Sequence, residues 1–311
     1  MTVCIAAITA EMKIVACTDL KLSTALTSAE SAVKFNPLNG EWYAMVAGDQ
    51  ARLEPMIRSI REGLQGRIND LPVVEHVCGA AFRKQKAEFA AHKHLSGFGL
   101  TMKEFLNIGK KKLDQAAYFS LCDAIRNTRL GCALLVSGFD AAGEPHIFDV
   151  SDDECCGNRD NPGYWAIGSG GRLALVSLLL REHSRREALA ETIYNVCVAK
   201  FVAETEGAVG VRTHLFVLGR DGPINTDVSL VSGVREAWET DEKPKAPDED
   251  VLRSIESMVG VARHPVSTHE YKSILRATRG INRMLDEEKN RLRKKKRGDK
   301  PPSVALHKRK E

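Results

Sequence analysis

The chain opens with two short runs that are rich in apolar and β-branched residues, with four residues between them. The runs cover residues 2–9 and 14–19, and the connection is 10–13. Such a pair predicts an antiparallel hairpin. Because the first run starts at residue 2, removal of Met1 would leave a threonine at the end of a strand. Thr2 would then carry both its hydroxyl and a free α-amine.

A threonine that keeps its own α-amine is a recognised form of activated nucleophile. The amine titrates at about 7.7–8.0 in unperturbed peptides, close to where a general base works at neutral pH. The alternative is an ordinary edge strand whose first residue happens to be threonine. The rest of the sequence has to distinguish the two.

The order of the remaining elements favours antiparallel sheets covered by helices, which is an α+β class. Strands and helices come in groups and do not alternate singly, so βαβ units are not expected. A helix capped by Asp49 follows the early strands, and residues 72–127 are mostly helical with a break at 95–99. A capping box at 184–187 predicts the start of a second late helix. The predicted strands are 32–35, 41–47, 132–138, 146–150, 164–167, 214–218 and 224–231, and the predicted late helices are 173–181 and the one after it.

Composition excludes several other classes. No apolar run approaches the roughly 20 residues that a membrane-spanning helix needs, and no signal segment is recognisable. The eight cysteines are scattered without a CxxC pair, so neither a zinc site nor a cofactor is predicted. A reducing cytoplasm is the expected location.

The positive charge of the chain is concentrated at its C-terminal end. Residues 281–311 carry 12 Lys and Arg against 5 Asp and Glu, so the rest of the chain has a net charge of −3. We expect a domain at 1–239, a linker at 240–250, a helical extension at 251–297 and a disordered basic tail at 298–311. A solvated basic helix and a partner-binding or coiled-coil helix both fit the extension, whereas nucleic-acid binding is disfavoured because it rests on charge alone.

The early strands offer a candidate for each group that N-terminal threonine catalysis requires. Thr2 is the candidate nucleophile. Lys34 stands alone in an apolar run and can supply the cation, and Asp19 ends the second strand where it can hold that cation. Gly48 ends the fourth strand, where a backbone N–H can approach a substrate without a Cβ in the way.

These residues, together with the segments 17–19, 32–34, 45–48 and 166–171, resemble the β-type proteasome subunits. The closest likeness is to the bacterial HslV-like branch of the N-terminal nucleophile (Ntn) hydrolases, and it covers roughly residues 2–235. The resemblance implies a four-layer αββα sandwich that assembles into homo-oligomeric rings around an enclosed chamber. It also implies hydrolysis of peptide bonds in protein or peptide substrates. No residue pattern here indicates an ATP-driven unfoldase as a further partner.

Carried onto this sequence, the resemblance makes Thr2 the nucleophile and Lys34 the cation that favours its ionised form. Asp19 orients Lys34, the Gly48 N–H forms the oxyanion hole, and Ser169 supports the α-amine. Lys21 and Ser23 fall where the family binds the substrate backbone. The chain departs from the family pattern at Glu206 and Val209, where an Asp and a Ser are expected.

Other interpretations remain open. Val209 and the long additions to the domain favour a non-catalytic ring or scaffold subunit, in which Lys34 and Asp19 are a structural ion pair. An Ntn amidohydrolase that acts on a small amide is a third possibility. Cys4 is expected to be a buried small residue. A dinucleotide loop at 168–173 is disfavoured, because Leu173 stands where the third glycine belongs.

Overall fold

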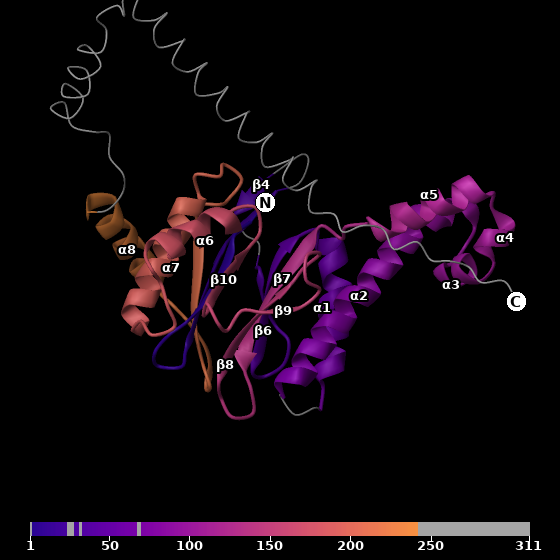
Figure 1. Cartoon of the computed structure of the whole chain (residues 1–311). Helices are drawn as coiled ribbons and strands as arrows, with labels where there is room; N and C mark the ends of the chain where they lie inside the picture. The colour runs from indigo at the N-terminus through magenta and orange to yellow at the C-terminus, as the bar shows by residue number, and fades with distance from the viewer. Residues whose placement is uncertain (1, 24–27, 31–32, 67–69, 242–311) are drawn as a thin grey trace, which may run out of the picture. The chain divides into compact units, whose positions relative to one another are not determined.

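The computed structural model describes residues 2–23, 28–30, 33–66 and 70–241 (Figure 1). This part of the chain combines two five-stranded antiparallel sheets, a short hairpin and helices. The first sheet has the order β10-β1-β2-β11-β12, and the second has the order β5-β6-β7-β8-β9. The predicted combination of antiparallel sheets with covering helices is therefore present.

The bounds of the strands follow the expected runs in most places. In the first sheet they are β1 Cys4–Ile8, β2 Ile14–Asp19, β10 Tyr164–Ile167, β11 Thr213–Gly219 and β12 Gly222–Asn225. In the second sheet they are β5 Phe35–Pro37, β6 Trp42–Gly48, β7 Cys132–Phe139, β8 Pro145–Val150 and β9 Gly157–Asn158. The separate hairpin, which we did not expect, pairs β3 Lys21–Ser23 with β4 Ser28–Glu30.

Strand β1 is buried on both faces because each face packs against a different layer. Cys4 and Ile8 point between the two sheets, where they meet residues of the second sheet such as Met45. Val3 and Ile5 point the other way, into the helices. The opening run consequently reads as continuously apolar, in the way of a strand that is covered on both sides.

Helices cover the outer face of each sheet (Figure 1). Helices α1 (Gln50–Leu64) and α2 (Leu71–Leu95) pack on the second sheet. Helices α6 (Gly171–Leu180), α7 (Leu189–Ala203) and α8 (Val228–Asp241) pack on the first. Asp49 caps α1 as predicted, because its side chain accepts a hydrogen bond from the Ala51 N–H.

The far end of α2 extends beyond the sheet and carries a small helical subdomain (Figure 1). The chain breaks at the predicted point and continues as η1 (Ser96–Phe98), α3 (Met102–Glu104), η2 (Phe105–Gly109), α4 (Lys110–Lys112) and α5 (Gln115–Arg126). Leu95, Leu100 and Phe105 form a separate apolar cluster there.

Three expectations about element boundaries were wrong. The predicted strand 224–231 ends at Asn225, and α8 begins at Val228 after the Asp227 side chain accepts a hydrogen bond from the Ser229 N–H. The box at 184–187 forms a turn, and α7 starts only at Leu189. The strand predicted at 32–35 begins at Phe35 and runs to residue 37.

The predicted linker and C-terminal segments fall almost wholly outside the described residues. Thr240 and Asp241, the first two positions of the expected linker, are the last residues of α8. The rest of 240–250, together with 251–297 and 298–311, lies beyond the described part. Of the helices that are described, none combines the length and apolar character needed to cross a membrane.

A histidine held between two carboxylates joins the β7–β8 turn to the segment after β9. The His146 Nδ1 lies 2.7 Å from Asp160 Oδ2, and its Nε2 lies 3.5 Å from Asp140 Oδ2. Burial alone would lower the pKa of His146, but the hydrogen bond to Asp160 and the negative charge of both carboxylates outweigh it and raise the pKa above its ordinary value.

We predict that His146→Gln destabilises the protein more at about pH 5.5 than at about pH 8.5. A histidine whose pKa is higher in the folded than in the unfolded protein stabilises the fold fully at pH values below its unfolded-state pKa. This contribution is lost as the pH rises through the folded-state pKa. Urea denaturation of both proteins at the two pH values measures the difference. Equal destabilisation at both values would show that the histidine contributes only through packing.

Candidate active site

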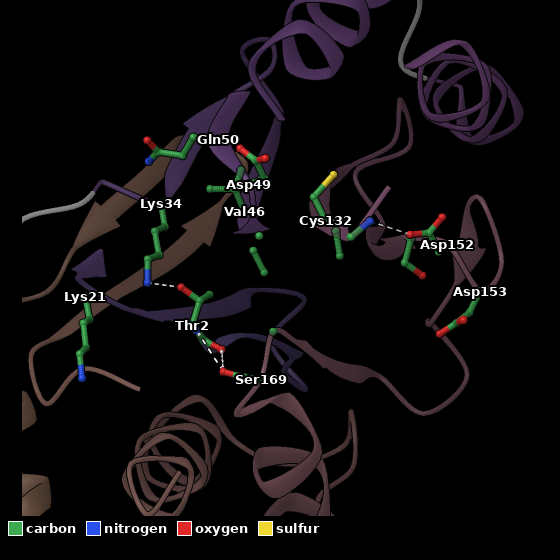
Figure 2. A pocket seen from close by; sticks show the side chains of 16 residues that line it. Thr2, Lys21, Lys34, Val46, Asp49, Gln50, Cys132, Asp152, Asp153 and Ser169 are labelled. Carbon is green, nitrogen blue, oxygen red and sulfur yellow. Dashed lines mark hydrogen bonds between the residues drawn. The ribbon is translucent and has the colours of Figure 1, made fainter. Parts of the chain in front are cut away.

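Lys34 brings the predicted nucleophile and the predicted carboxylate together. Its ammonium donates a hydrogen bond to Thr2 Oγ1 (Figure 2) and lies 2.7 Å from Asp19 Oδ1. All three residues are buried, and the Asp19 side chain is fully inaccessible. A cation is therefore held between a carboxylate and a hydroxyl with little access to water.

The hairpin register explains why Thr2 and Asp19 meet. The β1–β2 ladder pairs Cys4 with Thr18, so Thr2 and Asp19 fall at the same end of the two strands. The Val3 N–H donates to Asp19 Oδ1 at 2.9 Å. Lys34 lies just before β5 in the second sheet, and its carbonyl accepts from the Val46 N–H at 3.1 Å. The site thus joins the ends of both sheets.

Asp19 is held by more than its ion pair. The Lys21 N–H and the Gly210 N–H donate to Asp19 Oδ2 at 3.1 and 3.0 Å. A buried ion pair survives desolvation only when further hydrogen bonds satisfy it, and these amides supply them. Gly210 is required there, because a Cβ would lie 2.6 Å from Lys21 Cβ and 3.1 Å from Asp19 Oδ2.

The turn from β10 into α6 wraps around Thr2. The Thr2 nitrogen lies 3.3 Å from Ser169 Oγ and donates to it, while the Thr2 carbonyl accepts from the Gly170 N–H at 3.2 Å. Gly168 has a φ of +92°, and a Cβ at this position would clash with the Thr2 carbonyl oxygen. The predicted strand-to-helix turn therefore places Ser169 beside the Thr2 nitrogen.

Gly48 ends β6 with a φ of +108°, which an L-residue with a side chain rarely adopts. A Cβ there would lie 2.6 Å from the Gly131 carbonyl oxygen and 2.7 Å from Cys132 Cα. Glycine is thus required by both conformation and space. Gly48 lines the same pocket as Thr2, as an oxyanion-hole donor must.

A pocket of about 740 Å³ opens beside Thr2. Figure 2 shows Lys34 pointing toward Thr2, with Asp49 and Gln50 beyond it and Cys132 and Asp152 on the opposite wall. Sequence reasoning missed this wall, because it comes from the start of β7 and the segment after β8. No local motif connects those segments with residue 2.

The carboxylates that line the pocket are each paired with a cation. Asp49 lies 3.2 Å from Arg52, Asp152 lies 2.9 Å from Lys86, and Asp153 lies 2.9 Å from Arg129. Burial would raise the pKa of Asp152, but hydrogen bonds from backbone amides and from Lys86 outweigh it and hold that pKa below its usual value. The negative charge of these three carboxylates is therefore largely balanced by neighbouring cations.

Several other residues singled out from the sequence have clear positions. Lys21 lines the pocket and donates to the Gly207 carbonyl at 3.2 Å, and Ser23 is the last residue of β3. Glu206 is exposed, while Val209 is buried and faces Gly170. Neither provides a second polar contact to the Thr2 nitrogen among the described residues.

Cys4 is a buried residue of β1, as expected. Its sulfur lies 3.5 Å from Thr18 Oγ1 and from the Val46 carbonyl oxygen, and its single S–H points at these two acceptors. Burial raises the pKa of Cys4 to about 12, so its reactive thiolate form is disfavoured.

No family model matches this chain, and no curated protein matches it. Within the described residues, no group of His, Cys, Asp and Glu side chains could hold a metal ion.

We predict that Asp19→Asn costs about 3–5 kcal/mol of folding free energy, because it leaves the buried Lys34 ammonium without a counter-charge. Denaturant unfolding measures this loss. Asp49→Asn is a matched control: Asp49 is 46% exposed, and asparagine is also a good helix N-cap, so its cost should stay within about 1 kcal/mol. Similar costs for both variants would contradict the buried pair.

Proposed function

We propose that this protein is a threonine-type hydrolase of the proteasome and HslV class, with Thr2 as the nucleophile after removal of Met1. The observation that carries the proposal is the buried Lys34 ammonium, which contacts both Thr2 Oγ1 and Asp19 Oδ1 at the edge of a pocket. Free hydroxyls are poor nucleophiles near neutral pH, and a fixed adjacent cation favours the alkoxide form.

The reaction follows from the groups in place. The α-amine of Thr2, held near Ser169 Oγ, takes the hydroxyl proton while Oγ1 attacks the carbonyl carbon of a peptide bond. The negative charge on the carbonyl oxygen is met by the Gly48 N–H. The amine then gives its proton to the leaving nitrogen, the C–N bond breaks, and an ester to Thr2 remains. The same amine takes a proton from water as the water oxygen attacks the ester, the bond from carbon to Oγ1 breaks, and the amine returns that proton to Oγ1.

The arrangement of layers supports the proposal. Helices α1 and α2, the two sheets, and helices α6 to α8 follow one another as a helix–sheet–sheet–helix stack. This agrees with the four-layer αββα sandwich that the family resemblance implies. We propose protein or peptide substrates, because the pocket beside Thr2 is large and partly open. No cofactor takes part in the proposed reaction.

A non-catalytic ring or scaffold subunit is the second candidate. It is favoured by Glu206, which is exposed, and by Val209, which is apolar, because neither side chain supports the Thr2 nitrogen. Among the described residues, Ser169 is the side chain that accepts a hydrogen bond from it. An enzyme needs the free amine, whereas a scaffold does not. The two candidates therefore differ in whether Thr2 reacts.

We also propose that copies of the chain associate, as a ring-forming family requires, and that they do so in the cytoplasm. Helix α6 exposes Val176, Leu179 and Leu180, whose exposed fractions are 45%, 66% and 78%. Their spacing puts them on one face of the helix. All eight cysteines are free thiols in the structure, which suits a reducing compartment.

Thr2→Ala should abolish hydrolysis of a fluorogenic peptide, whereas Thr2→Ser should keep part of it because the hydroxyl and the amine both remain. Initial rates of the three purified proteins measure this. Thr18→Ala, which changes a buried neighbour outside the pocket, is the control for general damage. Equal turnover by the wild type and Thr2→Ala would exclude Thr2 as the nucleophile.

We predict that Leu179→Glu reduces the mass of the particle in solution, because a charge on the apolar face of α6 opposes its burial against another copy. Light scattering after size-exclusion chromatography measures the mass. Leu106→Glu is the matched control, since Leu106 is about equally exposed but lies in the helical subdomain after α2. An unchanged mass for Leu179→Glu would show that α6 does not join the copies.

A further inference from the structure

A second buried ionic cluster lies behind the candidate active site. Lys200, on α7, is fully buried, and its ammonium lies 2.5 Å from Glu204 Oε1. Arg235, on α8, binds the same carboxylate through both guanidinium ends, at 2.9 and 2.5 Å. The Arg235 guanidinium also lies over the Phe201 ring, 3.9 Å from its centroid. Burying the Lys200 ammonium is costly unless charges and hydrogen bonds around it compensate, and Glu204 supplies the counter-charge.

The cluster binds one backbone carbonyl in the segment between α7 and β11. Lys200 donates to the Val211 carbonyl at 2.7 Å, and Arg235 donates to it at 3.5 Å. On the other side of the segment, Glu30 accepts from the Val211 and Arg212 N–H groups at 3.0 and 3.2 Å. The peptide groups around Val211 are therefore fixed by charged side chains from three separate elements.

The residue before Val211 carries the contact that matters for the site. The Gly210 N–H donates to Asp19 Oδ2, while the other oxygen of Asp19 meets Lys34. The carboxylate is planar, so a shift of the Gly210 amide would turn both oxygens together. The direction in which Asp19 presents Oδ1 to Lys34 is thus set by the Gly210 amide together with the Val3 and Lys21 amides, which also donate to this carboxylate.

We infer that Lys200, Glu204 and Arg235 form a positioning cluster that fixes the Gly210 amide on Asp19 and so holds Lys34 against Thr2. The inference deepens the proposed function and rests on it. These residues touch neither the pocket nor Thr2, and they act through Val211, Gly210 and Asp19. Helix α8 contributes Arg235 and therefore helps to orient the proposed nucleophile.

Arg235→Met tests this inference, because Arg235 lies at the edge of the cluster and is about a quarter exposed. We expect kcat for peptide hydrolysis to fall about tenfold with KM within about twofold, since small misplacements of reacting groups reduce the rate of the chemical step. Arg235→Lys, which keeps the charge without the two-pronged contact, should recover part of kcat.

Arg181→Met is the matched control. Arg181 also contacts α7, through Asn195 at 2.7 Å and over the Tyr194 ring, but near the middle of that helix and away from Lys200 and Glu204 at its C-terminal end. It should leave kcat unchanged. If the wild type is active and Arg235→Met keeps its kcat, or loses no more than Arg181→Met does, the inference is overturned.

Hydrogen exchange provides a readout that does not depend on activity. The Gly210 amide should exchange about tenfold faster in Arg235→Met than in the wild type, while the Leu135 amide of β7 should be unaffected. An inactive wild type would contradict the proposed function, but the Gly210 result would still decide the positioning link. Unchanged Gly210 exchange would refute that link whatever the activity.

Discussion

The ion pair between Lys34 and Asp19 is the interaction on which the rest of the structure depends. Removing two charges from water is expensive, and their mutual attraction alone does not compensate for it. The backbone amides of Val3, Lys21 and Gly210 make up the difference by donating to the carboxylate. Val3 and Gly210, which are 16 and 191 residues from Asp19 in the sequence, must therefore both reach it before the pair can form. The same requirement places Lys34 beside the Thr2 hydroxyl.

The layered fold supplies this meeting point. Strand β1 lies inside its sheet, with helices on one face and the second sheet on the other, so its end is held firmly. The turn from β10 into α6 closes over Thr2, and it needs glycine at position 168 because of the close approach of the Thr2 carbonyl. The cluster of Lys200, Glu204 and Arg235 on α7 and α8 fixes the segment around Val211, and the neighbouring Gly210 amide donates to Asp19. Rigid elements on every side thus position a small set of polar atoms.

Local signals in the sequence predicted the elements closest to the site. The opening hairpin, the Asp49 cap and the turn at Gly168 each have short-range patterns, and the hairpin register alone brings Thr2 near Asp19. The β-branched residues of 224–231 suggested a strand, whereas Asp227 begins a helix there. The pocket wall at Cys132 and Asp152 and the cluster around Lys200 arise from contacts between distant segments. Periodicity and turn chemistry carry no information about such contacts.

The most direct test of the account is to locate the residue that an acylating β-lactone modifies in the purified protein. Intact-mass analysis followed by peptide mapping would give both the N-terminal residue and the position of the adduct. If the buried Lys34 ammonium activates the Thr2 hydroxyl, the mature chain begins at Thr2 and carries one adduct on that residue. The adduct is then absent from the Lys34→Ala variant. A chain that retains Met1, or an adduct that persists without Lys34, would contradict it.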